Sequence, residues 1–406
     1  MKILHTADWH LGQNFFQYDR SWEHAQFLEW ISSLIKDRKV DTLLISGDVF
    51  DTANPSAASQ KMYYSFLTTQ LINNPGLQII ITAGNHDSAN RLEAPSELLE
   101  VMRVSVRGSI ARDVSGELDY DRLLVALTKG GVCLAVPYIR QGDYPLGMTY
   151  SEGVNYIYSQ LTQKAKESYG APIVAMGHLV ATGSEISSRS EFDGPPSERS
   201  IIGGVEGVSP ETFDGDIVYT ALGHLHKGQR VSGRENVRYS GSPLAMSFAE
   251  RNNKQSVVLV TIQSDNVSLE IEKIEFSSPV KLLRVPALGY KCKEEVIDEL
   301  RKLPDGEINE QSPYLEVNVQ IYQPEPMLKV EIEEAIKGKA VRLTRIGTFT
   351  KQSDDIKQRN LSSVDELIAM SPMDIAKDVF RKKFVGDEMP DDMLIRLNNI
   401  IEKVQL

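Results

Sequence analysis

The chain has 406 residues, 41% of them hydrophobic, and a formal net charge of −12. That length exceeds what one hydrophobic core usually supports, so we expect a large domain and a smaller one. The acidic excess argues against a simple nucleic-acid binder, which usually presents a basic face, without excluding one.

The first predicted elements are apolar, β-rich runs that end at a glycine or another small residue. Near-continuous apolar runs predict strands buried on both faces. Helical patterns over residues 27–35 and 56–72 separate the first three runs, as crossover helices of βαβ units would. The runs cover residues 2–6, 42–46, 77–82, 173–176 and 217–222.

A second group of runs alternates more regularly between apolar and polar residues. It predicts strands at residues 104–111, 123–127, 132–136, 237–239, 257–262 and 267–276. The economical α/β architecture for both groups is two packed mixed sheets flanked by helices. The segment 184–210 has little periodicity and is expected to form a long loop near the functional site.

The pattern changes after Pro279 to that of a small α/β cap domain. Strands are predicted at residues 281–285, 314–321 and 340–349, with helices at 293–303 and 325–336. The tail from residue 351 reads as helical, with two amphipathic helices at 374–384 and 391–404 that favour docking onto another protein over packing on the parent domain. The predicted domains are therefore 1–278, 279–350 and 351–406.

Two features indicate the compartment. Cys133 and Cys292 are far apart and lack a paired spacing, so they are predicted to be reduced, packed thiols. No apolar run reaches the roughly 18 residues that would span a bilayer, and the amino terminus shows no signal-peptide pattern. We expect a soluble cytoplasmic protein.

Most of the histidines lie in short pieces that follow the first group of strands. In open α/β sheets, strand ends deliver their side chains to one crevice. Imidazole nitrogens together with carboxylate and amide oxygens suit borderline divalent metals, and two such ions about 4 Å apart can clamp an in-line phosphoryl displacement. The pattern predicts a two-metal phosphoesterase site. Its pieces are Asp8-Trp9-His10, Gly47-Asp48, Gly84-Asn85-His86-Asp87, Gly177-His178 and Gly223-His224-Leu225-His226.

The pieces differ in how specific they are. Gly-Asn-His-Asp would arise by accident on the order of once per thousand chains of this length, whereas Asp-x-His alone is common. The alternative for Gly-Asn-His-Asp is a turn at a strand end with a hydrogen-bonded histidine, and the alternative for His224-x-His226 is a pair on a surface strand. His5, inside the first strand, is expected to be a core histidine, and His24 a surface or packing residue.

These pieces, with residues 3–12, 47–52 and Tyr239-Ser240-Gly241-Ser242-Pro243, resemble the calcineurin-like metallophosphoesterases and, among them, the nuclease subunits of bacterial SbcCD-type complexes. The resemblance implies two divalent metal ions, most often Mn²⁺, held by two ligand sets and one bridge. Asp8, His10 and His226 would bind one ion, Asn85, His178 and His224 would bind the other, and Asp48 would bridge the two.

The resemblance also implies catalytic roles outside the ligand sets. His86 would stabilise the transition state at the scissile phosphate or protonate the leaving 3′ oxygen, and Asp87 would hold the His86 ring in orientation. Related families carry histidine where this chain has Asp51, which is expected instead to open a turn. Arg91, Arg140 and Arg189 are candidate phosphate contacts, although ordinary solvated or ion-paired arginines are the favoured alternative.

The implied function is a DNA nuclease that acts on double-stranded ends as a 3′ to 5′ exonuclease and on hairpins as an endonuclease, in DNA repair, recombination and replication. It would work as a homodimer within a heterotetramer, with an SbcC-type ATPase bound to the tail helices and the cap positioning DNA. Two alternatives remain open: a metallophosphatase or phosphodiesterase for a small or non-DNA substrate, and a non-catalytic scaffold of the ATPase.

Overall fold

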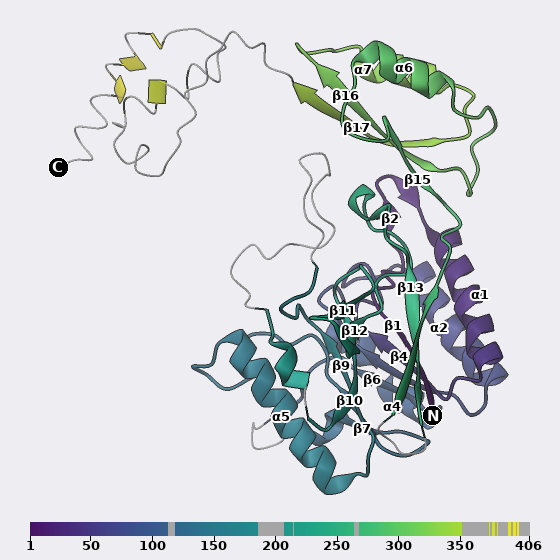
Figure 1. Ribbon diagram of the computed structural model, residues 1–406, viewed down its shortest axis with the longest axis vertical. Helices are drawn as coiled ribbons and strands as arrows, with labels where there is room; N and C mark the ends of the chain where they lie inside the picture. Colours follow the sequence, from purple (N-terminus) through teal and green to yellow (C-terminus); the bar gives the residue numbers. More distant parts are fainter. Residues whose placement is uncertain are drawn as a thin grey trace. The chain divides into compact units, whose positions relative to one another are not determined.

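The computed structural model describes residues 1–112, 118–185, 207–213, 215–263 and 268–350, with isolated positions between 373 and 397 (Figure 1). The contacts divide the chain into two compact units, Met1–Phe349 and Thr350–Leu406. Most of the predicted loop 184–210 and of the tail helices at 374–384 and 391–404 lies outside the described residues. The following description concerns the first unit.

The first sheet has six strands and contains the strands that precede the first three motif pieces. Its central strands run parallel, and two antiparallel strands extend one side. In spatial order they are β14 (Leu269–Glu275), β13 (Ser256–Ile262), β1 (Lys2–Thr6), β4 (Thr42–Ser46), β5 (Gln78–Thr82) and β6 (Val104–Arg107).

The second sheet also has six strands and carries the last two motif pieces. Four central strands run parallel, and an antiparallel strand closes each edge. Their spatial order is β11 (Gln229–Val231), β12 (Arg234–Tyr239), β10 (Ile217–Gly223), β9 (Ile173–His178), β8 (Val132–Ala135) and β7 (Leu124–Ala126). The prediction of two mixed sheets is confirmed.

The two sheets pack face to face, with helices on the outer faces (Figure 1). Leu44 of β4 belongs to the core between the sheets, whereas its neighbours Leu43 and Ile45 belong to the core under the helices. This burial on both faces explains why these strands read as continuous apolar runs. The helices are α1 (Ser21–Arg38) and α2 (Ala57–Asn73) on the first sheet and α5 (Tyr150–Ser168) on the second.

Short helical segments complete the large domain. They are α3 (Ala89–Glu93), α4 (Ser96–Val101) and the 3₁₀ turns η1 (Asp121–Leu123), η2 (Pro210–Phe213) and η3 (Phe248–Glu250). The sequence patterns did not predict α3, α4 or the 19-residue α5. Cys133 and Cys292 are free thiols, as predicted. Within the described part of the chain, no helix has the length and apolar character needed to cross a membrane.

The cap follows as a three-stranded sheet with two helices and its own apolar core. Its strands are β15 (Leu282–Val285), β16 (Tyr314–Ile321) and β17 (Arg342–Thr350), and its helices are α6 (Lys293–Arg301) and α7 (Leu328–Ala335). A buried cluster of the aromatic residues Phe15, Phe248 and Tyr314, together with Val280, joins it to the large domain. It lies beside the hairpin of β2 (Asn14–Phe15) and β3 (Tyr18–Asp19). The Tyr314 hydroxyl donates to the Glu23 carboxylate at 2.6 Å.

Candidate metal centre

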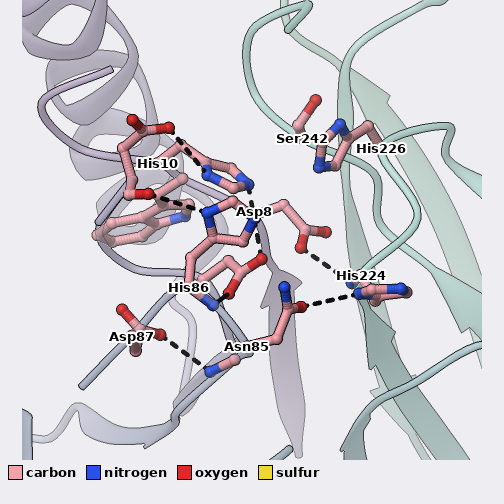
Figure 2. A network of polar contacts seen from close by, with 12 residues as sticks. Asp8, His10, Asn85, His86, Asp87, His224, His226 and Ser242 are labelled. Carbon is pink, nitrogen blue, oxygen red and sulfur yellow. Dashed lines mark hydrogen bonds and ion pairs between the residues drawn. The ribbon is translucent and has the colours of Figure 1, made fainter. Parts of the chain in front are cut away.

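The seven predicted ligand side chains come from both sheets and meet at one end of the sandwich. Strands β1, β4 and β5 of the first sheet and β9 and β10 of the second each reach this end with their carboxyl termini. Figure 2 shows Asp8, His10 and Asn85 on the side of the first sheet facing His224 and His226 on the side of the second. Motif pieces more than 200 residues apart are thus brought into one pocket.

The backbone at the pocket is unusual. Asp8, His10, Asp48 and His224 all have positive φ angles, of 54°, 47°, 49° and 96°, which L residues with side chains rarely adopt. Such conformations persist only where the surrounding structure enforces them, and they concentrate at functional sites. Here the backbone amides of Asp8 and His10 donate to the carbonyls of Gly47 and Asp48 at 3.0 Å, which locks the two loops together.

Two glycines allow the pieces to approach one another. A Cβ on Gly47, which has a φ of 85°, would lie 2.1 Å from the His178 Nδ1 atom, and a Cβ on Gly84 would lie 2.1 Å from the Asp48 Oδ1 atom. Any side chain at either position would therefore displace a predicted ligand.

Asp8, His10 and His226 form the first group of ligand atoms, all within 4.8 Å of one another. Their side chains are buried, yet Asp8 Oδ2 and both ring nitrogens of His10 have no hydrogen-bond partner among the described residues. Burying polar atoms without partners is costly. A cation bound by Asp8 Oδ2 and one ring nitrogen of His10 would give both of these atoms a partner.

Asn85, His178 and His224 form the second group. The Asn85 Oδ1 atom lies 3.0 Å from both His178 Nε2 and His224 Nδ1. Asp48 touches both groups, because its Oδ2 atom lies 3.3 Å from His178 Nε2 and 3.7 Å from His10 Nε2. This position is the one that a bridging carboxylate would take.

The electrostatics around Asp48 and His178 favour positive charge, whereas burial raises the pKa of Asp8 and lowers that of His224 to about 3. Burial would lower the pKa of His178, but the neighbouring Asp48 and Asp8 carboxylates raise it to about 9. Burial would raise the pKa of Asp48, but His178 and His10 outweigh it and hold that pKa well below its usual range. Buried carboxylates that draw a proton onto a neighbouring imidazole would equally attract divalent cations. The residues present therefore fit divalent metal ions.

The structure assigns Asp87 a different contact from the predicted one. Its buried carboxylate accepts hydrogen bonds from the backbone amides of Gly84, Val49 and Phe50 at 2.9–3.1 Å, and does not bond to the His86 ring. The His86 Nδ1 atom instead contacts the backbone carbonyl of Asp51 at 2.9 Å. The predicted orienting role of Asp87 is therefore wrong. The Asp87 carboxylate connects the loop of His86 to the loop of Asp48 by hydrogen bonds. The Asp51 backbone carbonyl orients the His86 ring.

Sequence reasoning missed two carboxyl groups at the site. The Asp51 side chain, expected only to open a turn, lies 3.4 Å from His10 Nδ1. Glu250 lies 3.3 Å from His226 Nδ1. Asp51 is three residues from Asp48, so its position could have suggested a role, whereas no local signal marks Glu250.

The remaining candidates lie outside the ligand groups. His5 is a core histidine as predicted, with Nδ1 2.9 Å from the Tyr219 hydroxyl. His24 is buried on α1, with Nε2 3.1 Å from the Trp9 carbonyl, and so is a packing residue. The guanidinium groups of Arg91 and Arg140 contact Asn54 and the Tyr138 ring, and Arg189 lies outside the described residues.

Comparison with known proteins identifies the family of the chain. Residues 1–228 match the family described as Calcineurin-like phosphoesterase, and residues 278–384 match the Type 5 capsule protein repressor C-terminal domain. The chain is 34% identical over 368 residues to the SbcD subunit of the SbcCD nuclease from Rhodobacter capsulatus, covering 86% of this chain and 88% of the relative. The proteins of the same name from Escherichia coli K12 and Bacillus subtilis 168 are 26% and 27% identical, over 98% of this chain and 96% of each relative.

Proposed function

The chain belongs to the calcineurin-like phosphoesterases and to the SbcD family of SbcCD nuclease subunits, and from this premise we propose that it is the metal-dependent DNA nuclease subunit of an SbcCD-type complex. The single observation that carries the proposal is the convergence of two ligand groups on Asp48, whose Oδ2 atom contacts one histidine of each group. The proposed reactions are 3′ to 5′ exonuclease cleavage at double-stranded ends and endonuclease cleavage at hairpins, in DNA repair, recombination and replication.

In this proposal the pocket holds two divalent metal ions, with Mn²⁺ the preferred one. Asp8, His10 and His226 hold one ion, Asn85, His178 and His224 the other, and Asp48 both. When bound, such ions supply Lewis-acid stabilisation of the phosphoryl oxygens and a water of lowered pKa. The mixture of carboxylate, amide and imidazole ligands suits manganese and also accepts iron, cobalt or zinc.

The protein's own contribution centres on His86. Its Nδ1 atom is engaged by the Asp51 carbonyl, and its backbone amide donates to Asp48 Oδ1 at 2.8 Å. The ring is only partly buried and lies 4.9 Å from the His10 ring. Its Nε2 atom is therefore the one proposed to hydrogen-bond a phosphoryl oxygen of the substrate, or to give a proton to the leaving 3′ oxygen.

The proposal divides the chain into a nuclease domain (1–278), a cap that positions DNA (279–350) and a tail that binds an SbcC-type ATPase (351–406). A homodimer through helices of the nuclease domain is also proposed. The exposed apolar side chains Leu98, Val101 and Met102, on and beside α4, support such a contact.

The test of catalysis uses the purified full-length chain with an end-labelled DNA duplex, with and without the ATPase. Bis(4-nitrophenyl) phosphate serves as a small phosphodiester control. A chelator should abolish cleavage of both substrates and Mn²⁺ should restore it, with shortening of the duplex from its 3′ ends in the complex. Cleavage of bis(4-nitrophenyl) phosphate without cleavage of the duplex would instead favour an enzyme for small substrates. Binding of the ATPase without any cleavage would identify a scaffold.

The test of the tail is a chain that ends at Lys351. This truncation should lose co-purification with the ATPase while hydrolysing the small phosphodiester at the full-length rate, because every predicted ligand precedes residue 227. The full-length chain purified in parallel is the control. Co-purification that survives the truncation would rule out the tail as the ATPase-binding segment.

A further inference from the structure

The two ligand groups differ in what contacts the Nδ1 atoms of their histidines. His226 Nδ1 lies 3.3 Å from Glu250 Oε1, and His10 Nδ1 lies 3.4 Å from Asp51 Oδ1. In the second group, by contrast, His178 Nδ1 meets the uncharged backbone carbonyl of Ser46 at 2.9 Å. On the Nδ1 side, His226 and His10 thus face carboxyl groups outside the predicted ligand set. His178 Nδ1 bonds a backbone carbonyl instead, and the carboxylates near His178 are the predicted ligands Asp48 and Asp8.

A hydrogen bond to one nitrogen of an imidazole affects how the other nitrogen binds a metal. When one ring nitrogen donates its hydrogen to a carboxyl group, the tautomer and the ring orientation are fixed and the other nitrogen becomes a better ligand. His226 makes this hydrogen bond to Glu250 through Nδ1, whereas His10 Nδ1 faces the Asp51 carboxylate at 3.4 Å without a hydrogen bond. Both contacts leave Nε2 of each ring as the metal-binding atom.

Glu250 is the better placed of the two carboxyl groups. It is 1% exposed, and its second oxygen, Oε2, accepts a hydrogen bond from the Met246 backbone amide at 2.8 Å. It ends the turn η3, where Phe248 packs in the aromatic cluster with Phe15 and Tyr314. Burial and packing thus hold this carboxyl group in place, whereas the Asp51 side chain is 30% exposed and more strongly screened by water.

We propose that Glu250, assisted by Asp51, is a positioning residue that makes the Asp8, His10 and His226 position the tighter of the two metal positions. This inference rests on the proposed two-metal function. Outer carboxyl partners of metal-binding histidines typically contribute about 10- to 100-fold in affinity. The centre is then filled in order, with the first ion bound by the group that contains His226.

The test is a calorimetric titration of the metal-free, full-length chain with Mn²⁺, followed by electron paramagnetic resonance to distinguish a lone ion from a coupled pair. The wild type should bind two ions with different affinities. Glu250→Gln has one acceptor oxygen in place of two, so it cannot accept from both His226 and Met246. It should weaken the tighter ion by about 10- to 100-fold and leave the weaker one unchanged.

Two further variants keep the test decisive. Glu23→Gln makes the same chemical change at a carboxyl group that is 2% exposed but contacts Arg20 and Tyr314 rather than a predicted ligand, so both affinities should stay at the wild-type values. Asp51→Asn removes the charge of a side chain that is 30% exposed, and should weaken the tighter ion by about tenfold. It decides the question if Glu250→Gln does not fold.

The outcomes separate this inference from the proposed function. If the wild type binds two ions and both Asp51→Asn and a folded Glu250→Gln retain the tighter affinity, the positioning role is overturned and the nuclease proposal stands. A loss confined to the weaker ion also overturns it. A wild type that binds fewer than two ions overturns the two-metal function itself.

Discussion

At the scale of single residues, substitutions of His86 and Asp48 should have different effects on turnover and on metal binding. His86→Ala is expected to retain both ions but to lower turnover by about 10²- to 10⁴-fold, the usual contribution of a general acid or base. Turnover of bis(4-nitrophenyl) phosphate and metal content per chain are the measurements. Asp48→Ala is the comparison, because it contacts both ligand groups and should lose metal as well. Wild-type turnover in His86→Ala would remove this residue from the mechanism.

Asp87 should act on stability rather than on the His86 ring. Asp87→Ala leaves the buried backbone amides of Gly84, Val49 and Phe50 without their acceptor, so we expect the free energy of unfolding to fall by on the order of 3 kcal/mol. Urea unfolding at pH 7 measures this loss. Asp87→Asn keeps one acceptor oxygen and should lie between the two. An alanine variant as stable as the wild type would contradict this account.

The sequence predicted the residue types of the site, but not the residues that hydrogen-bond to the predicted ligands and to His86. Each ligand follows a strand that the apolar pattern identifies, and strand ends converge in an α/β sheet. The contact between Glu250 and His226 spans 24 residues and depends on how η3 packs under the cap. Sequence adjacency suggested Asp87 as the partner of His86, whereas the turn after Asp48 brings the Asp51 carbonyl to that ring.

At the scale of elements, the joint between cap and nuclease domain depends on Tyr314. Its hydroxyl donates to Glu23 at 2.6 Å inside the aromatic cluster, and the Arg342 guanidinium lies 3.9 Å from its ring centroid. Tyr314→Phe preserves the packing but removes the donor, and should lower the free energy of unfolding by about 1–3 kcal/mol. Chemical unfolding measures it. Tyr18→Phe, which loses a neutral contact with the Leu343 carbonyl, is the control and should cost less.

The sequence predicted strands better than helices. Strands β1, β4 and β5 are buried on both faces and read as unbroken apolar runs. Helix α5 was missed although Thr149 and Glu152 form a complete capping box at its start. Val154, Ile157 and Leu161 also recur at helical spacing and are buried, so the sequence contained both signals for this helix. Which sheet each strand joins depended on long-range pairing that no local pattern contains.

At the scale of the whole molecule, buried histidines should make the fold sensitive to acid. Burial lowers the pKa of His5 to about 3, from an ordinary value of 6.5. The unfolded chain therefore takes up this proton first as the pH falls, and the stability present above pH 6.5 is lost between pH 6.5 and 3. The loss from one such group is about 1.4 kcal/mol per pH unit within that window.

The measurement is urea unfolding of the metal-free protein from pH 7 to pH 4.5, with His5→Gln as the matched variant. The variant lacks the titrating ring, so its stability should fall less steeply with acid than that of the wild type. Parallel curves for the two proteins would show that His5 contributes nothing to the acid sensitivity.

The division of the chain could be anticipated only in part. The change of pattern after Pro279 coincides with a separate apolar core formed by the cap strands and helices. The aromatic cluster that joins this core to the large domain could not be predicted, because Phe15 and Tyr314 are almost 300 residues apart. Local sequence patterns can identify the apolar core of one domain. The contact between two cores is formed by residues far apart in the sequence, so these patterns do not predict it.

The left-handed backbone at Asp8, His10, Asp48 and His224 bears on how the protein acquires its ions. The backbone amides of Asp8 and His10 bond the Gly47 and Asp48 carbonyls, and the His224 amide bonds Asp8 Oδ1, so protein contacts help to set the shape of the pocket. We therefore expect one ion to be exchanged for another without refolding. Which metal occupies the pocket would then follow the relative supply of competing metals in the surroundings. A change in that supply would adjust the activity of protein that has already been made.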